Sequence, residues 1–95
     1  MQISSVDTEQ QTELLLNGVD LLRGIIAFHI NAAKRSRYAK AAYYMCVIRD
    51  IFAYLQRENE FQQYFREIIS QNNRRPALRD EMRIVYGKEA TMVRK

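Results

Sequence analysis

Apolar residues recur at every third or fourth position through most of this chain, which is the spacing of a helix that packs one side against a core. The third quarter of the chain shows this spacing most cleanly, with apolar side chains at Phe61, Tyr64, Phe65, Ile68 and Ile69. No segment alternates apolar and polar residues in the way of a half-buried strand. The pattern therefore predicts an all-α fold.

Residues that commonly begin and end helices divide this pattern into elements. Ser36 and Asn59 can act as N-caps, because their side-chain oxygens accept hydrogen bonds from the free amides of a first turn. Pro76 suits the first position of a helix, and Gly87 suits its stop. We expect helices over residues 8–33, 36–56, 59–71 and 76–87, the first of them long and the last of them short.

The length and composition of the chain fit one small globular domain. It has 95 residues, of which 47% are hydrophobic and 27% are charged. A domain of this size buries roughly 60–65% of the surface of its unfolded chain, so its stability depends on close packing or on partners. We expect a single helical domain over residues 1–95, with flexible ends at 1–7 and 88–95.

The first predicted helix is apolar around more than half of its circumference. One stripe runs through Leu15, Val19, Leu22, Ile26, His29 and Ala33, and a second runs through Leu14, Leu21, Ile25, Phe28 and Ala32. A helix of ~25 residues is ~38 Å long and overhangs a compact domain of this size. Its apolar face then needs a cover, and we predict a homodimer held by Leu15, Val19, Leu22, Ile26 and Phe28.

Charge is distributed unevenly along the chain, whose net charge is +4. Residues 1–33 hold four acidic residues against Arg23, a balance of −3, and the remaining 14 basic and 7 acidic residues leave +7 over 34–95. Such asymmetry is compatible with nucleic-acid contact. It also suits an acidic helix of one copy lying against the basic half of another, or simply a solvated face.

Two clusters of basic residues support the alternative of a nucleic-acid-binding protein. The first has an aromatic ring among its cations, which is an arrangement that can hold phosphates and stack a base. The competing interpretation places these cations at helix C-termini, where the helix dipole stabilises them. The candidate contacts are Lys34, Arg35, Arg37, Tyr38 and Lys40 in the 34–40 cluster, and Arg74, Arg75, Arg79 and Arg83 in the 74–83 cluster.

Residues that carry catalysis or bind metals are scarce. His29 and Cys46 are the only residues of their types, so one chain lacks the four ligands of a zinc site and cannot form an internal disulfide. No phosphate-binding glycine loop and no Ser-His-Asp set is present. We expect no enzyme activity, no catalytic residues, no metal and no cofactor. With charges inside the most apolar run and no signal-peptide pattern, we also expect a cytoplasmic protein without a membrane span.

The stretch Arg35–Met82 resembles the C-terminal helical region of bacterial SWIM zinc-finger proteins. In that region a Tyr-x-x-Ala helix, a polar turn, a Phe-x-x-Tyr helix, a basic link and a closing helix follow one another. The matching positions here are Tyr38 and Ala41, Phe61 and Tyr64, Arg74 and Arg75, and Leu78. Tyr38-x-x-Ala41 is also similar to the second helix of a tetratricopeptide-type hairpin.

The Cys-x-Cys…Cys-x-His zinc motif of the SWIM family is absent, so the resemblance carries over no zinc and no zinc-dependent contact with DNA. It implies a tetratricopeptide-like helical hairpin, whose usual role is contact between proteins. The hypothesis from the sequence is a non-catalytic interaction or adaptor module that self-associates, with an unidentified protein partner. The alternative is a small basic protein that binds nucleic acid through the two clusters.

Overall fold

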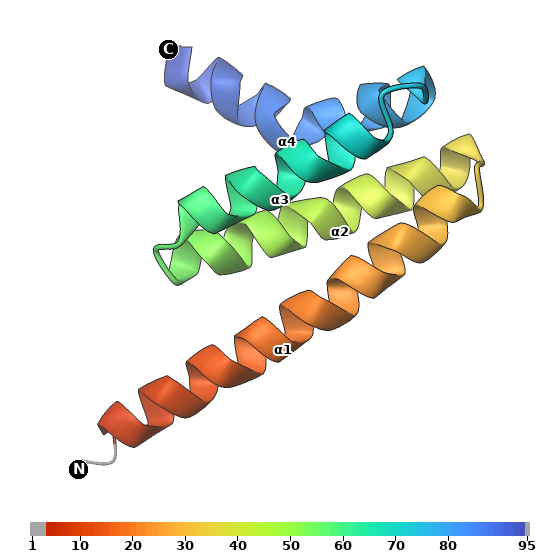
Figure 1. Ribbon diagram of the computed structural model, residues 1–95. Coiled ribbons are helices and arrows are strands. Elements are labelled where there is room, and N and C mark those ends of the chain that lie inside the picture. Colours follow the sequence, from red (N-terminus) through yellow and green to blue (C-terminus); the bar gives the residue numbers. More distant parts are fainter. Residues whose placement is uncertain (1–3, 95) are drawn as a thin grey trace.

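The computed structural model describes the backbone of residues 4–94 and the side chains of residues 8–85. Over these residues the chain forms helices and no strand, which confirms the predicted all-α fold (Figure 1). The helices are α1 (Ser4–Asn31), α2 (Arg35–Tyr54), α3 (Glu58–Gln71) and α4 (Pro76–Arg94).

The helix α2 lies at the centre of the fold and is the neighbour that the other three helices share. α3 folds back along it to form a hairpin, α4 crosses the same side, and α1 runs along the opposite side (Figure 1). From the link near residue 33, α1 moves gradually away from α2 toward the N-terminus (Figure 1). This arrangement leaves one long side of α1 without a neighbour.

The core forms where α2 meets α1 on one side and α3 and α4 on the other. Ile48 and Met45 of α2 are completely buried, as are Ile26 of α1 and Leu78 of α4. These residues stand at helical spacing on the apolar stripes that the sequence shows, so burial follows the predicted periodicity. The remaining buried residues are Val19, Ile30, Tyr38, Ala41, Ala42, Phe52, Phe61, Tyr64, Met82 and Val85.

The links after α1 and α2 each contain a residue other than glycine whose backbone is in the left-handed conformation. Ala33 has φ 57° and Gln56 has φ 60°. The amide of Gln56 donates to the carbonyl of Ala53 at 3.0 Å, and that of Arg57 donates to the carbonyl of Phe52 at 2.8 Å. These bonds form a Schellman cap, in which glycine is usual because the left-handed region costs other residues roughly 1–2 kcal/mol. This cap closes the short link between α2 and α3, and the left-handed Ala33 lies in the short link between α1 and α2.

Several predicted helix ends differ from the structure. Ser36 lies inside α2, whose N-cap is Lys34, and Asn59 lies inside α3, whose N-cap is Arg57. Neither N-cap residue makes a side-chain capping hydrogen bond, so the short links between the helices, rather than capping side chains, set these starts.

The fourth helix is longer than predicted. It continues through Gly87 to Arg94, since one glycine inside a helix costs only about 1 kcal/mol. The expected flexible ends at 1–7 and 88–95 include residues 1–3 and 95, which lie outside the described residues. The rest of both segments belongs to α1 and α4.

Candidate interaction surface

The two apolar stripes of α1 face different directions. Val19, Ile26 and Ile30 are buried against α2, and Leu16 and Leu22 pack beside them. The predicted self-association set therefore needs correction, because Val19 and Ile26 belong to the core of the chain itself and are closed to a second copy. Leu22 and Leu15 are half-buried, and only Phe28 of that set is widely exposed, at 63%.

The second stripe, which we call the outer seam, consists of Leu14, Gly18, Leu21, Ile25 and Phe28. Leu14 and Leu21 are 69% and 72% exposed, and Ile25 and Phe28 also face solvent. Successive members of the outer seam are four, three, four and three residues apart, which is the spacing of a coiled-coil contact line. At 100° per residue, Leu21 points ~140° away from the buried Ile26. The outer seam is thus separate from the core.

From Asn17 onward, the neighbours of the outer seam on its far side carry no charge, whereas Glu13 lies beside Leu14 at its start. Asn17, Gly24 and Asn31 occupy this flank, and all three are exposed. Uncharged flanks leave nothing to repel a second helix laid along the outer seam, whereas like charges at such positions oppose pairing. The outer seam and this flank together make a long, mostly uncharged strip of surface that is suited to another helix.

No contact within the chain explains why position 18 is a glycine. A Cβ atom built at this position meets nothing within 4 Å, so no neighbour in the fold requires a glycine here. Glycine inside a helix is nevertheless about 1 kcal/mol less favourable than alanine. A partner that approaches the backbone closely at Gly18 would account for the cost.

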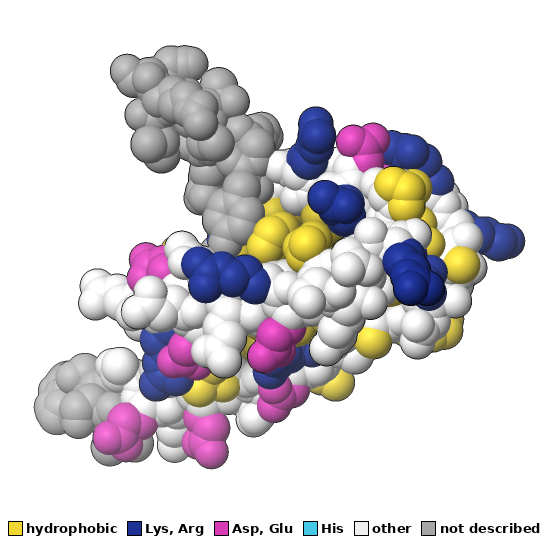
Figure 2. Space-filling model, turned by 45° about the horizontal axis from the view of Figure 1, so that its top comes forward, with side chains coloured by type: hydrophobic (Ala, Val, Ile, Leu, Met, Phe, Trp, Pro, Cys, Tyr) yellow, Lys and Arg dark blue, Asp and Glu magenta, His cyan; other side chains and the backbone are white. Residues whose placement is uncertain are grey.

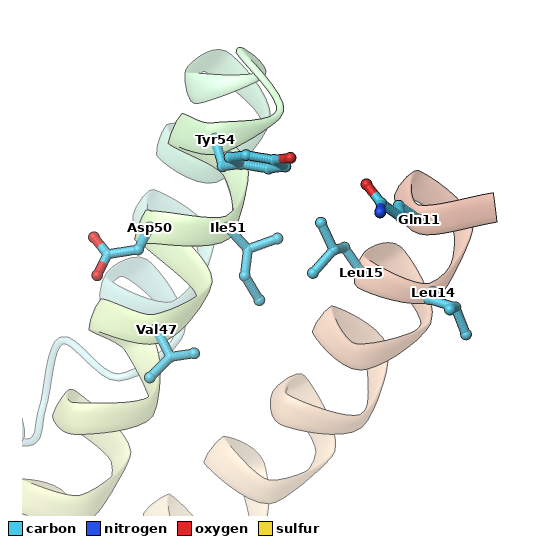
Figure 3. A pocket seen from close by; sticks show the side chains of 7 residues that line it. All are labelled: Gln11, Leu14, Leu15, Val47, Asp50, Ile51 and Tyr54. Atoms are coloured by element: carbon cyan, nitrogen blue, oxygen red, sulfur yellow. The ribbon is translucent and has the colours of Figure 1, made fainter. Parts of the chain in front are cut away.

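Beside the outer seam, an open groove of ≈ 540 Å³ lies where α1 moves away from α2 (Figure 3). Leu15 on α1 points across it toward Ile51 and Tyr54 on α2, while Leu14 points away along the outer seam (Figure 3). The remaining lining residues are Gln11, Val47 and Asp50. Most of this lining is apolar, so the groove extends the apolar surface of α1 onto α2.

A row of aromatic rings joins the last turns of α1 to α2. His29 stacks on Tyr44 with ring centroids 6.0 Å apart, and its edge contacts Phe28 at 5.5 Å. Tyr43 contacts Tyr44 at 5.3 Å, and the guanidinium of Arg37 lies 5.7 Å from the centre of the Phe28 ring. Aromatic side chains together with arginine are typical of protein interfaces.

The environment of His29 favours its neutral form. Loss of water around the ring lowers the pKa of His29 below its ordinary value of 6.5, and the positive charges of Arg37 and Lys40 lower it further. Nη1 of Arg37 lies 3.3 Å from Nδ1 of His29 and donates to it when Nδ1 carries no proton. The imidazole is therefore neutral at pH 7 and contributes no charge to this surface.

Four of the predicted nucleic-acid contacts are engaged within the chain, namely Arg37, which contacts His29, and three others. Tyr38 is buried and its hydroxyl accepts a bond of 3.0 Å from Arg75, so the predicted stacking role of Tyr38 is wrong in this fold. Arg75 also donates to the carbonyl of Ile30 at 3.3 Å. Arg35 donates to Asp80 at 2.7 Å and to Glu81 at 2.9 Å, and these bonds raise its pKa.

The other predicted contacts remain at the surface near the links 32–34 and 72–75. Lys34, Lys40, Arg74 and Arg79 are exposed and form no ion pair with any described side chain, and Arg83 lies 3.8 Å from Asp80. Figure 2 shows Lys and Arg side chains prevailing at the right end of the molecule and Asp and Glu side chains toward its lower left. The molecule therefore has a basic end, and a more acidic end where α1 begins.

Two further arginines have roles that the sequence did not reveal. Arg49 is half-buried and donates to the carbonyl of Val85 at 2.6 Å, which ties α2 to α4. Arg23 lies 4.4 Å from the centre of the Tyr64 ring. Burial raises the pKa of Tyr64, and the charge of Arg23 opposes this shift. Neither role has a local signal, because each depends on a residue distant in the sequence.

Comparison with protein families, with curated protein sequences and with solved structures finds no match to this chain. Among the described residues, His, Cys, Asp and Glu side chains form no group of three that could hold a metal ion. Over the same part of the chain, no helix combines the length and the apolar character that crossing a membrane requires.

Proposed function

We propose that this chain is a non-catalytic helical interaction module that self-associates through the outer seam of α1. The supporting observation is the exposure of four large apolar side chains, Leu14, Leu21, Ile25 and Phe28, along one line of a helix. Contiguous apolar surface of this kind on a small domain marks a contact with another molecule. A cytoplasmic location and a tetratricopeptide-like character of the α2–α3 hairpin stay predictions.

The extended shape of the chain supports the same proposal. Its radius of gyration is 15.0 Å, whereas a compact domain of about 100 residues has ~13 Å. The 28 residues of α1 give a helix ~42 Å long, much of it held by α2 alone. A second copy on the open side would bury the surface that the chain's own helices leave uncovered.

Replacing Leu21 with Glu tests this proposal. We expect the unmodified chain to have twice the mass of the 11.3 kDa monomer in light scattering, and Leu21→Glu to return it to the monomer mass. A charge at the centre of the outer seam opposes pairing, because it would have to lose its water in the contact. Helix content measured by circular dichroism should stay the same, since Leu21 is 72% exposed in the monomer.

Ile84→Glu is the matched control. Ile84 is also a large exposed apolar residue within a helix, but it lies on α4, away from the outer seam. This variant should keep the mass of the unmodified chain. A monomer mass for the unmodified chain, or an unchanged mass after Leu21→Glu, would overturn the proposal.

A second candidate function is contact with single-stranded nucleic acid at the basic end. It is favoured by the stretch Leu21–Arg49, which holds Arg23, Lys34, Arg35, Arg37, Lys40 and Arg49 and no acidic residue. In the same stretch the aromatic row offers the exposed rings of Phe28 and Tyr43 in place of the buried Tyr38. Cations beside exposed rings are the elements with which proteins hold single strands.

The second candidate function is tested by measuring the binding of a labelled single-stranded oligonucleotide through its fluorescence anisotropy. We expect micromolar binding that weakens steeply as salt rises, because phosphate contacts release counterions. Lys40→Glu should weaken binding several-fold more than Arg66→Glu, since Arg66 is an exposed cation of α3 away from the aromatic row. Equal effects of the two variants, or no binding at low salt, would contradict this function.

A further inference from the structure

We infer that the second copy binds antiparallel, with Gly18 of each chain facing Phe28 of the other. This inference rests on the proposed self-association and specifies its geometry. The register follows from the sizes of the side chains along the outer seam and from the charges at the two ends of α1.

Antiparallel pairing in this register matches large residues with small ones. Gly18 faces Phe28 of the second copy, Leu21 faces Ile25, and Leu14 faces Ala32. The smallest residue of the outer seam therefore receives the largest, and the open space around Gly18 is filled by a ring. The contact runs from residue 14 to residue 32, about five helical turns or ~27 Å.

The competing registers fit less well. A shift by one heptad in one direction places Phe28 opposite Gln11, so the largest apolar side chain meets a polar one. A shift in the other direction pairs Phe28 with Ile25 but leaves Leu14 and Gly18 beyond the end of the partner's α1. A parallel pair places Gly18 against Gly18, which leaves a void, and sets Phe28 against Phe28. Voids forfeit the packing contacts of their lining, so these alternatives use the apolar surface poorly.

Charge also favours the antiparallel arrangement. The exposed Glu9 and Glu13 lie in the first half of α1, whereas Lys34 and Arg37 follow its end. An antiparallel partner brings the acidic half of one copy near the basic end of the other, and a parallel partner brings like charges together. At physiological salt the Debye length is ≈ 8 Å, so charges on adjacent helices influence each other.

Disulfide trapping distinguishes these registers. In a Cys46→Ala background, Leu14→Cys and Ala32→Cys are made as separate chains, mixed in equal amounts and oxidised. A disulfide requires Cα atoms within about 7 Å. We expect a cross-linked dimer from the mixture and none from either chain alone, because two copies of residue 14 lie ~27 Å apart in this register. The mixture of Leu21→Cys and Ile25→Cys should also cross-link, because these residues face each other in this register, and Ile84→Cys should not cross-link.

Each outcome has one meaning. A cross-linked dimer from the Leu14→Cys chain alone shows a parallel pair and overturns the inference. A dimer by mass in the Cys46→Ala background without cross-links from either mixture also overturns it, and leaves self-association in place through another register or face. A monomer by mass in that background removes the proposed function itself, independently of the register.

Discussion

Ile48→Ala is expected to remove a large part of the stability of the domain. Ile48 is completely buried on α2, the helix against which the other three pack. Cutting an isoleucine to alanine in a core costs ~2–5 kcal/mol, because apolar contacts are lost and a cavity remains. The stability of a whole domain is only ~5–15 kcal/mol. Urea unfolding followed by circular dichroism at a fixed protein concentration should show this loss.

The control for this change is Tyr54→Ala, on the same helix. Tyr54 is 70% exposed, so its truncation should shift the unfolding midpoint much less. For a domain of this size, each kcal/mol moves the melting temperature by roughly 4–8 °C, which makes the two variants easy to separate. Equal shifts for both variants would mean that α2 does not occupy the centre of the core.

Arg75→Met is the second substitution with a large expected effect. It should lower the free energy of unfolding by ~1.5–3 kcal/mol. The guanidinium of Arg75 donates to the carbonyl of Ile30 at 3.3 Å and to the hydroxyl of Tyr38 at 3.0 Å. It therefore connects the end of α1, the start of α2 and the start of α4. Methionine keeps an unbranched apolar chain but donates no hydrogen bond. The Tyr38 hydroxyl and the Ile30 carbonyl each lose the bond from Arg75, and the carbonyl keeps only the bond from the Ala33 amide. Thermal unfolding of the variant measures the effect.

Arg74→Met provides the comparison for Arg75→Met. Arg74 stands next in the sequence, is exposed and has no ion-pair partner among the described side chains. Its loss should change stability by less than about 0.5 kcal/mol, as is usual at exposed positions. A similar loss of stability from both arginines would show that the net charge of the 74–83 cluster, and not the two bonds of Arg75, is what stabilises the fold.

The type and order of the helices could be predicted from the sequence because apolar periodicity is a local property. The residues at which the helices begin and end were harder to predict from the sequence. Ser36 and Asn59 are good N-caps in isolation, yet α2 and α3 begin one or more residues earlier, because left-handed residues at Ala33 and Gln56 close the links first. Gly87 lies within α4 for a related reason, since a single unfavourable residue does not end a helix.

The structure corrects part of the predicted self-association set, because Val19 and Ile26 lie in the core of the chain. Both stripes of α1 are apolar, and nothing within the helix tells which of them faces α2. The regular four-and-three spacing of the outer seam, with Gly18 in it, was the available signal. The basic residues pose the same problem. Arg74 and Arg75 are equivalent in the sequence, and only the position of Tyr38 in the fold separates a surface cation from an internal tie.

The central position of α2 also has a consequence for how the domain opens. α1 is held mainly by α2, whereas α2 is enclosed from both sides. Native proteins open in partial steps, and the segments with fewest buried contacts open first. Amide hydrogens of α1 would then exchange with solvent through detachment of that helix alone, while those in the middle of α2 would wait for global unfolding. A second copy along the outer seam would close the easier route, so association would slow exchange mostly in α1.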